Sequence, residues 1–310
     1  MTTAPWISVE DYGQPGGWPG AEQCAARSRE CCEALERGGV LFFAEPPFSF
    51  PREDRDFLLQ QRWTELRLHK NVSYRPSEGV LRGVSGDAPT IERLRAILRN
   101  YSEQVTAFAA KLLAPYAGKW ILDFASFRPL EEEGRDLPLH KRNDLLHVDA
   151  FPSRPTRGGR ILRVFTNVNP AKPRVWNTTD GFGPLAAQYA KPAGLDEIAR
   201  RGSVLSRTVQ SWGGKLGVRG MGRTAYDTFM LRFHDYLKEN ADFQARTRKI
   251  RLEFPPLATW LVFTDGVAHA VMSGQYAIEQ TFLIPAKALV APESAPYRVL
   301  EAIAGRPLVF

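Results

Sequence analysis

The chain is poor in cysteine and lacks any long hydrophobic run. Only three of its 310 residues are cysteines, and Cys24, Cys31 and Cys32 all fall within one predicted helix. Because a disulfide scaffold needs an even set of well-spaced cysteines, this clustering argues against one and indicates a reducing compartment. The longest apolar runs, such as 260–263, are far shorter than the roughly 20 residues that cross a bilayer. We therefore expect any contact with a membrane to be peripheral.

Other features that define special protein classes are also missing. The sequence has no internal repeat and no low-complexity tract, and three prolines, Pro5, Pro15 and Pro19, interrupt its first 20 residues. We expect no secretory signal there, because such a signal needs a basic start followed by an apolar core. Apolar residues make up 44% and charged residues 24% of the chain. That composition is typical of a globular enzyme and excludes a disordered or coiled-coil protein.

Basic residues outnumber acidic ones. The chain has 41 lysines and arginines against 34 aspartates and glutamates, which gives a formal net charge of +7. A positive surface attracts anionic partners, and nucleic acids, phosphorylated metabolites and acidic membrane surfaces all qualify. Composition alone does not choose among them.

Helical periodicity dominates the first third of the chain. Apolar residues recur there at spacings of three and four, which predicts amphipathic helices packed on a sheet. In the longest of them Thr90 is the expected N-cap and Pro115 the stop. The predicted helices span 21–37, 54–68 and 90–114, with a short strand at 40–43.

From residue 120 onward the pattern changes to short apolar runs separated by glycine, proline and aspartate, as in an antiparallel sandwich or barrel. We therefore expect a mainly β protein with flanking helices. Its core is a double-stranded β-helix (jelly-roll or cupin-like) over 120–310, with a helical insert near 224–240. The mostly helical part, 1–119, packs on the sheet, and 1–310 forms a single domain. The predicted core strands are 145–151, 160–168, 258–264, 269–272 and 277–284.

A candidate metal site begins at His147 and Asp149. Side chains two residues apart in a strand point to the same face, so these two can share one ion. His269 opens a later strand after an Asp-Gly turn at 265–266 and supplies a third ligand. Two histidines and one carboxylate form the facial triad that binds Fe(II) and leaves three coordination positions open. The competing interpretation is that a His-x-Asp pair in a strand is hydrogen-bonded filler, because so short a pattern recurs by chance.

Two further histidines have different settings. His234 lies on the predicted helix 224–240 beside its apolar stripe, so we expect a surface or packing role. His140 begins the stretch 140–143, which precedes the metal segment. That stretch either forms a solvated loop or presents hydrogen-bond donors to an acidic substrate.

An Fe(II) oxygenase with this triad usually takes electrons from 2-oxoglutarate, whose distal carboxylate suits the two-pronged donor set of an arginine. The segment after the last histidine, 272–281, has no arginine or lysine. The nearest substitutes are Arg163 and Arg160 on the strand 160–168. They are three residues apart, so only one points inward. We favour Arg163, with Arg160 as the alternative and Thr166 as a further cosubstrate contact.

Longer motifs surround the metal segment. The run HVDAFPSRPT at 147–156, the run GRILRVFTNVNP at 159–170 and the RVW at 174–176 resemble the Kdo hydroxylases, a family of Fe(II)/2-oxoglutarate-dependent dioxygenases. The resemblance covers most of the chain. It implies hydroxylation of carbon 3 of the outer 3-deoxy-D-manno-oct-2-ulosonic acid (Kdo) of Kdo2-lipid A to give Ko, in the biosynthesis of the lipopolysaccharide inner core. It also implies Fe(II) as the cofactor, 2-oxoglutarate as the cosubstrate and dioxygen as the oxidant, with ascorbate as a stimulant.

The same resemblance implies partners and a location. Kdo carries a carboxylate and lipid A carries phosphates, so a +7 surface suits an acidic glycolipid at an anionic membrane. We expect a cytoplasmic enzyme in peripheral contact with the inner face of the inner membrane, in an oligomeric state that the sequence leaves open. Basic side chains near the metal segment either contact the substrate or form a solvated rim. These candidates are His140, Lys141, Arg142, Arg154 and Arg174.

Two other classes of function stay open at this point. The first is a 2-oxoglutarate oxygenase that acts on another anionic substrate, a nucleobase or a protein side chain. The best basic run, 246–251, lacks the interleaved aromatic residues of a nucleic-acid reader and alternates like an edge strand, so we expect no nucleic-acid partner. The second is a metal-free jelly roll that binds a sugar or lipid. Iron-dependent release of CO₂ from 2-oxoglutarate separates that class from the enzymes.

Overall fold

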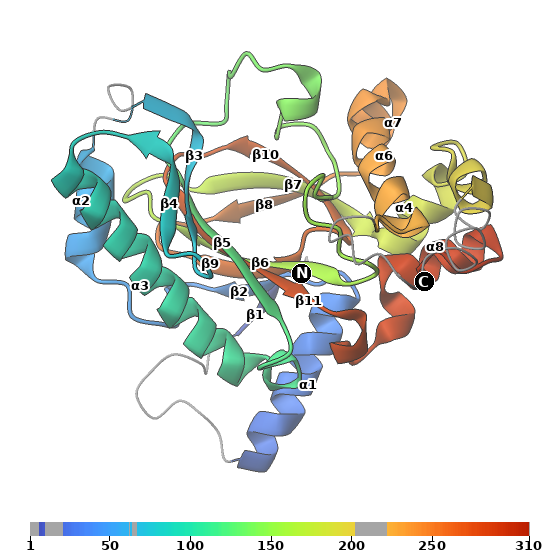
Figure 1. Ribbon diagram of the computed structural model, residues 1–310, viewed down its shortest axis with the longest axis horizontal. Coiled ribbons are helices and arrows are strands. Elements are labelled where there is room, and N and C mark those ends of the chain that lie inside the picture. The colour runs from blue at the N-terminus through green and yellow to red at the C-terminus, as the bar shows by residue number, and fades with distance from the viewer. Residues whose placement is uncertain (1–5, 10–20, 62, 64–66, 202–221, 310) are drawn as a thin grey trace, which may run out of the picture.

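Two β-sheets face each other in the computed structural model, with one group of helices along the larger sheet and another at one end of the molecule (Figure 1). The structure describes residues 6–9, 21–61, 63, 67–201 and 222–309. All hydrogen-bonded strand neighbours run antiparallel except β1 and β2. The larger sheet has the order β1 (Ile7–Ser8), β2 (Leu41–Phe43), β9 (Thr259–Phe263), β6 (Arg160–Asn167), β11 (Ala277–Ile284), β5 (Ile121–Arg128), β3 (Arg67–Arg75) and β4 (Val80–Ser85). The smaller sheet has the order β10 (Val267–Ser273), β7 (Arg174–Gly181) and β8 (Ile250–Phe254).

The interior between the sheets is partly filled by aromatic side chains. Phe165 and Trp260 of the larger sheet stack with ring centroids 5.2 Å apart. Trp176 of the smaller sheet meets both of them edge-on, at 5.0 Å and 5.6 Å. All three are buried, so this cluster joins the two sheets through apolar burial and favourable ring geometry. Phe165 and Trp176 also border the cavity that carries the polar residues described below.

Three N-terminal helices, α1 (Ala21–Glu36), α2 (Arg52–Gln60) and α3 (Ala88–Leu112), accompany the larger sheet. The apolar stripe of α3 contributes buried residues to a core shared with β5, β6 and β11. Tyr101 of α3 approaches the hydroxyl of Thr166 on β6 at 3.2 Å. The helices expected at 21–37 and 90–114 are confirmed. The N-cap is Asp87 rather than Thr90, because the Asp87 carboxylate accepts the backbone N–H of Thr90 at 2.9 Å.

The prediction of a helix over 54–68 is wrong in its second half. Helix α2 ends at Gln60, and Leu68 lies in β3. The hairpin of β3 and β4 therefore adds strands to a part of the chain that we expected to be mostly helical. Its pairing partner is β5, where Val72 lies opposite Phe127. That contact joins positions 55 residues apart, so it cannot be predicted from local periodicity.

The helices α4 (Phe182–Tyr189), α6 (Ala225–Glu239), α7 (Ala241–Arg246) and α8 (Pro296–Ala304) gather at the other end of the molecule (Figure 1). The helix expected at 224–240 is confirmed. Thr224 and Asp227 form a capping box at its start. Asp227 also accepts the backbone N–H groups of Thr156 and Arg157 at 2.8 Å and 3.0 Å, which fastens α6 to the loop after residue 149. Short 3₁₀ turns lie at η1 (Ala114–Tyr116), η2 (Leu139–Lys141), η3 (Ala286–Ala288) and η4 (Pro292–Ser294).

The segment 145–151 is not the regular strand that we predicted. Only His147 forms a bridge, with His269, while the N–H of Asp149 donates instead to the carbonyl of Thr264 at 2.8 Å. The other four predicted core strands are confirmed. The described residues also contain β7, which we did not predict, and β8, which overlaps the expected edge strand at 246–251. Within the described ranges no helix has the length and apolar character needed to cross a membrane.

Candidate metal centre and active-site cavity

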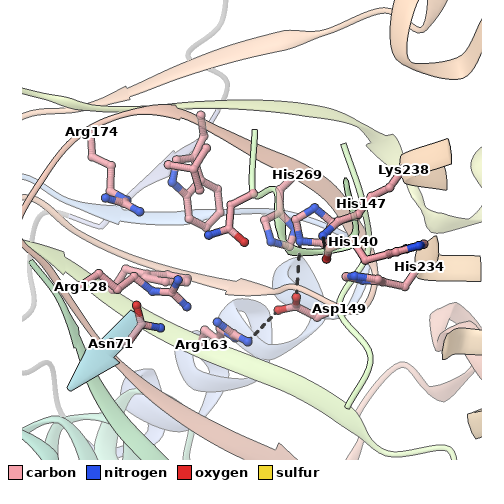
Figure 2. A pocket seen from close by; sticks show the side chains of 14 residues that line it. Asn71, Arg128, His140, His147, Asp149, Arg163, Arg174, His234, Lys238 and His269 are labelled. Carbon is pink, nitrogen blue, oxygen red and sulfur yellow. Dashed lines mark hydrogen bonds and ion pairs between the residues drawn. The ribbon is translucent and has the colours of Figure 1, made fainter. Parts of the chain in front are cut away.

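His147, Asp149 and His269 come together between the two sheets (Figure 2). One nitrogen from each histidine and one carboxylate oxygen lie within 4.8 Å of one another. Two backbone hydrogen bonds fix the histidines: His147 N–H to the carbonyl of His269 at 3.1 Å, and the reverse at 2.9 Å. The Nε2 atom of His147 is 3.7 Å from Oδ1 of Asp149. A single ion placed among these atoms would have ligands from all three residues.

The hydrogen bonds of the two histidines fix which nitrogen is free. Nδ1 of His147 faces its neighbouring carbonyl, Leu145 O, at 2.7 Å, and Nδ1 of His269 faces Val267 O at 2.9 Å. A carbonyl only accepts, so each Nδ1 carries a hydrogen and each Nε2 keeps a lone pair. Such orientation by a second hydrogen bond is the usual support of a metal-binding histidine. Both Nε2 atoms are therefore prepared to bind a cation.

The charge states of the three residues also suit a divalent cation. Burial lowers the pKa of His147 well below its ordinary value, and burial lowers that of His269 too. Both rings are thus neutral at pH 7. Burial alone would raise the pKa of Asp149, but the adjacent Arg163 guanidinium, 3.0 Å away, brings it below the ordinary range. An ionised carboxylate and two neutral imidazoles form the donor set of a mononuclear Fe(II) site, so the residues fit that metal.

A buried ion pair supports the turn that leads to His269. Arg160 Nε donates to Asp265 at 2.8 Å, and both side chains are at most 2% exposed. Asp265 also accepts the N–H of Ile161 at 3.1 Å. At Gly266 an added Cβ would lie only 2.2 Å from the Arg160 guanidinium, which explains the glycine. Arg160 therefore fastens the β9–β10 turn to β6 and does not line the cavity, which corrects our expectation that it was the alternative 2-oxoglutarate anchor.

Removing this ion pair from one side is expected to destabilise the fold. Arg160→Met leaves Asp265 charged and buried, at a cost of about 3–5 kcal/mol in the free energy of unfolding. The double variant Arg160→Met/Asp265→Asn removes the unpaired charge and should recover part of that loss. Chemical denaturation of both variants measures the difference. This role would be contradicted if Arg160→Met were as stable as the wild type. It would also be contradicted if the double variant were less stable than Arg160→Met.

A cavity of about 230 Å³ opens beside the three residues. Arginines and an asparagine lie on one side of the triad, and a lysine and two histidines lie on the other (Figure 2). Arg163 lines it, as expected, with Phe165 on the same face of β6. The arginine side comprises Asn71 of β3, Arg128 of β5, Arg163 of β6 and Arg174 of β7, and the other side comprises His140 of η2 with His234 and Lys238 of α6.

The arginine side carries a network of buried charges. Glu279 of β11 accepts two hydrogen bonds from Arg128, at 3.2 Å and 2.9 Å, and is also contacted by Nη1 of Arg163 at 3.2 Å. Burial would raise the pKa of Glu279, but the two guanidinium groups lower it. Glu279 is therefore ionised and holds both arginines in place.

Arg174 is less well compensated than its neighbours. Its Nη1 donates to the carbonyl of Gly274 at 2.8 Å, but the nearest carboxylate oxygen, on Glu132, is 3.9 Å away. Burial and the charge of Arg128 lower the pKa of Arg174 to about 10. Two buried donors here, Nε of Arg174 and Nε1 of Trp176, find no acceptor among the described residues. Buried donors without partners are costly, so this side of the cavity is built to receive an anion with several oxygens.

Other residues expected in the site lie outside the main cavity. Thr166 is on the opposite face of β6 from Arg163, where its hydroxyl contacts Tyr101 and Thr259. Arg142 pairs with Asp144 at 2.5 Å, and Lys141 is exposed on η2. Arg154 pairs with Asp123 and lies over Phe124 and Phe151. Of the five predicted substrate contacts, only His140 and Arg174 line the cavity, and Arg174 does so on the arginine side.

Sequence reasoning missed several cavity residues. Arg128 ends a strand of mixed apolar residues and carries the same signal as Arg163, a charge within a buried strand. Trp176 was noted only as part of a motif, although it stacks on His269 at 5.1 Å. His234 does pack, as expected, but edge-on against His147 at 4.8 Å and in the cavity wall. The signal for Lys238 was its spacing of four residues from His234, which places both on one face of α6.

Comparison with known proteins gives a consistent result. A family model described as 3-deoxy-D-manno-oct-2-ulosonic acid (Kdo) hydroxylase matches residues 20–307. A crystal structure of the Kdo hydroxylase KdoO with cobalt(II) is 33% identical over 99% of this chain and 98% of that chain, with a TM-score of 0.80. The KdoO complex with α-ketoglutarate and Fe(III) is 32% identical over 98% of this chain and 97% of that chain, with a TM-score of 0.78. The KdoO complex with succinate and Fe(III) is 33% identical over 99% of this chain and 98% of that chain, with a TM-score of 0.79.

A search of curated protein sequences finds no match. The structures of KdoO are described as those of a non-heme Fe(II) α-ketoglutarate-dependent dioxygenase. Their similarity to this chain confirms the jelly-roll architecture expected from the strand pattern. The family model spans almost the whole chain. This protein belongs to the Kdo hydroxylase family.

Proposed function

We propose that this protein is an Fe(II)/2-oxoglutarate-dependent dioxygenase that hydroxylates carbon 3 of the outer Kdo of Kdo2-lipid A to give Ko. The whole chain acts as one catalytic domain. The proposal rests on one observation above the others: a His-Asp-His cluster that fits Fe(II) lies beside an arginine-lined cavity, in a chain of the Kdo hydroxylase family. The reaction consumes 2-oxoglutarate and dioxygen and yields the hydroxylated sugar, succinate and CO₂.

His147, Asp149 and His269 would hold the iron. When bound, ferrous iron and 2-oxoglutarate supply the oxidation that breaks the substrate C–H bond, one oxygen atom entering the sugar and the other succinate. The protein's own residues orient the reactants. The carbonyls of Leu145 and Val267 keep both imidazoles in the tautomer that binds metal. All three side chains line the cavity, so an ion that they held would be open to the cosubstrate from that side.

Arg128, Arg163 and Arg174 would bind 2-oxoglutarate. The nearest carboxylate oxygen to Arg174, on Glu132, is 3.9 Å away, and Arg174 and Trp176 have unused donors here. A dicarboxylate supplies both the negative charge and the acceptor oxygens. These arginines lie on β5, β6 and β7, which explains how the site dispenses with a cation on the final core strand, β11.

The glycolipid substrate suggests where the enzyme works. Kdo2-lipid A is anionic and membrane-bound, and the chain has a net charge of +7. We propose that the protein acts on the inner face of the inner membrane through peripheral contact, because a positive surface gains Coulomb energy near anionic headgroups.

A direct assay tests the proposed function. Purified protein is incubated with Fe(II), 2-oxoglutarate, ascorbate and Kdo2-lipid A, and the glycolipid is analysed by mass spectrometry. We expect one added oxygen on a Kdo residue, matched by an equal amount of succinate. Lipopolysaccharide core sugar from cells with and without the gene should show the same difference. Iron-dependent CO₂ release with no change in the glycolipid would point to another anionic substrate, and no CO₂ release would indicate a binding protein.

A further inference from the structure

Lys238 is a buried cation that none of the interactions described so far requires. It lies in the last turn of α6, is 4% exposed, and lines the cavity that contains the metal triad. Its ammonium donates one hydrogen bond, to the backbone carbonyl of His140 at 3.0 Å. An ammonium group has three donors, and burying it without an anionic partner is costly. In the described part of the chain, no carboxylate oxygen lies within 4.0 Å of it.

The carboxylates around Lys238 are engaged with other side chains. Three of them raise its pKa: Asp149, Asp235 and Asp144, in that order, against the larger lowering by burial. Asp149 has Arg163 at 3.0 Å, Asp235 has Nδ1 of His140 at 3.2 Å, and Asp144 has Arg142 at 2.5 Å. Each carboxylate is therefore directed toward a different partner. Lys238 therefore lines the cavity without a carboxylate counterion among the described residues.

The position of Lys238 separates it from the cosubstrate site. The arginines that suit 2-oxoglutarate lie on one side of the triad, whereas Lys238, His234 and His140 lie on the other (Figure 2). His234 donates through Nδ1 to the carbonyl of Val148 at 2.8 Å, so its Nε2 keeps a lone pair and Lys238 is the cation on this face of α6. The cavity thus has two cationic sides with the metal triad between them. Two different anions suit such an arrangement better than one.

We propose that Lys238 binds the carboxylate of the sugar acid and thereby directs carbon 3 toward the metal triad. The inference rests on the proposed function, and it adds the residue that recognises the substrate. In a 3-deoxy-2-ulosonic acid the carboxylate is carbon 1, and only carbon 2 separates it from carbon 3. A group that holds this carboxylate must therefore lie close to the metal site, inside the cavity. Basic residues on the outer rim, such as Arg142, are already paired and lie outside the cavity lining.

The ligand chemistry argues for a carboxylate rather than a lipid phosphate. Phosphates of lipid A are attached to a different sugar from the Kdo that reacts, so they would lie outside this cavity when carbon 3 is at the metal. After its bond to the carbonyl of His140 the Lys238 ammonium has two donors left, which match the two oxygens of one carboxylate. The competing explanation is structural: Lys238 only holds η2 against α6 through the carbonyl of His140.

Paired ligands and paired variants separate these explanations. The probes are the α-methyl glycoside of Kdo, which has the carboxylate and no phosphate, and its C1 primary amide, which has the same shape without the charge. Binding is measured by calorimetry on full-length protein loaded with Co(II) and 2-oxoglutarate, so that turnover does not interfere. Wild-type protein should bind the acid about tenfold more tightly than the amide, because a charged hydrogen bond is stronger than a neutral one.

The variant Lys238→Met should bind acid and amide with equal affinity, the acid having lost about 10- to 100-fold. A merely structural role would weaken the binding of acid and amide alike and keep the preference for the acid, and the 2-oxoglutarate affinity should be unchanged. Lys119→Met is the matched control, because Lys119 also donates to a backbone carbonyl, that of Pro115 at 2.8 Å, but is exposed and outside the cavity lining. It should keep the preference for the acid.

Several results would overturn the inference. A Lys238→Met protein that still prefers the acid would place the carboxylate elsewhere, and a wild-type protein without that preference would remove the charged contact altogether. If Lys238→Met does not fold, Lys238→Gln removes the charge while its amide keeps a donor for the carbonyl of His140, and an undiminished preference for the acid in that variant would equally contradict the proposal. Failure of the wild type to bind either probe would also overturn the inference, because the sugar acid would then not be held by this cavity, whereas the proposed function is tested separately by the hydroxylation of Kdo2-lipid A.

Discussion

Asp149→Ala should reduce 2-oxoglutarate-dependent turnover to less than about one-hundredth of the wild-type rate. Loss of a residue that merely orients a metal ligand already costs about 10- to 100-fold in metal affinity or activity, so loss of a ligand itself should cost at least as much. Asp149 is also the only negative charge among the three clustered side chains, and it offsets the charge of a divalent ion. Release of CO₂ from labelled 2-oxoglutarate measures the rate, and calorimetric titration with Co(II) measures the metal affinity.

The fold should survive this substitution. Arg163 keeps its contact with Glu279 at 3.2 Å, and the hydrogen bond from the backbone N–H of residue 149 to Thr264 does not involve the side chain. Asp180→Ala provides the control, because Asp180 is an exposed aspartate at the end of β7 outside the metal cavity. That variant should retain wild-type turnover. Full activity in Asp149→Ala, with its thermal unfolding unchanged, would remove Asp149 from the metal site.

Arg174→Met should raise the dissociation constant of 2-oxoglutarate by roughly 10- to 100-fold. That factor corresponds to the loss of one charge-assisted hydrogen bond, which contributes about 1.5–3 kcal/mol. Arg174 is the informative arginine because its donors are the least used in the absence of ligand. Arg163 would be a poorer choice, since it also contacts Asp149 and its removal would disturb the metal site. The dissociation constant is measured by calorimetry on Co(II)-loaded protein.

The metal affinity itself should not change in Arg174→Met. Glu132 stays partnered when Arg174 is removed, because Arg135 lies 3.4 Å from it and Asn143 donates to it at 3.2 Å. Arg251→Met is the matched control: Arg251 lies on β8, next to β7 in the same sheet, but is exposed and paired with Glu253. If Arg174→Met binds 2-oxoglutarate as tightly as Arg251→Met does, the cosubstrate does not use the Arg174 side of the cavity.

The residues that sequence reasoning identified best are those whose geometry is local. His147 and Asp149 were expected to share a face from their spacing alone, and the structure brings them together although the segment is not a regular strand. His269 was placed by the Asp-Gly turn before it. The opposite orientations of Arg160 and Arg163 followed from strand alternation, and the structure puts only Arg163 in the cavity.

The residues that sequence reasoning missed depend on the order of strands in the sheets. Arg128 and Arg163 meet at Glu279 because β11 lies between β5 and β6, an arrangement of strands distant in sequence. Strand alternation could not tell whether Arg160 anchors the cosubstrate or forms an ion pair within the protein. Its ion-pair partner, Asp265, is 105 residues away in the sequence. The same holds for Lys238 on a helix. Helical spacing predicts which face of α6 carries it, but not that this face borders the cavity.

Anomalous diffraction from crystals grown with Co(II) and 2-oxoglutarate tests the metal site most directly. We expect one strong cobalt peak within bonding distance, about 2.0–2.2 Å, of Nε2 of His147, Nε2 of His269 and a carboxylate oxygen of Asp149. The oxo-acid should occupy adjacent coordination positions with its far carboxylate among Arg128, Arg163 and Arg174. A cobalt peak elsewhere in the protein, with these three side chains bound only to one another or to water, would contradict the account.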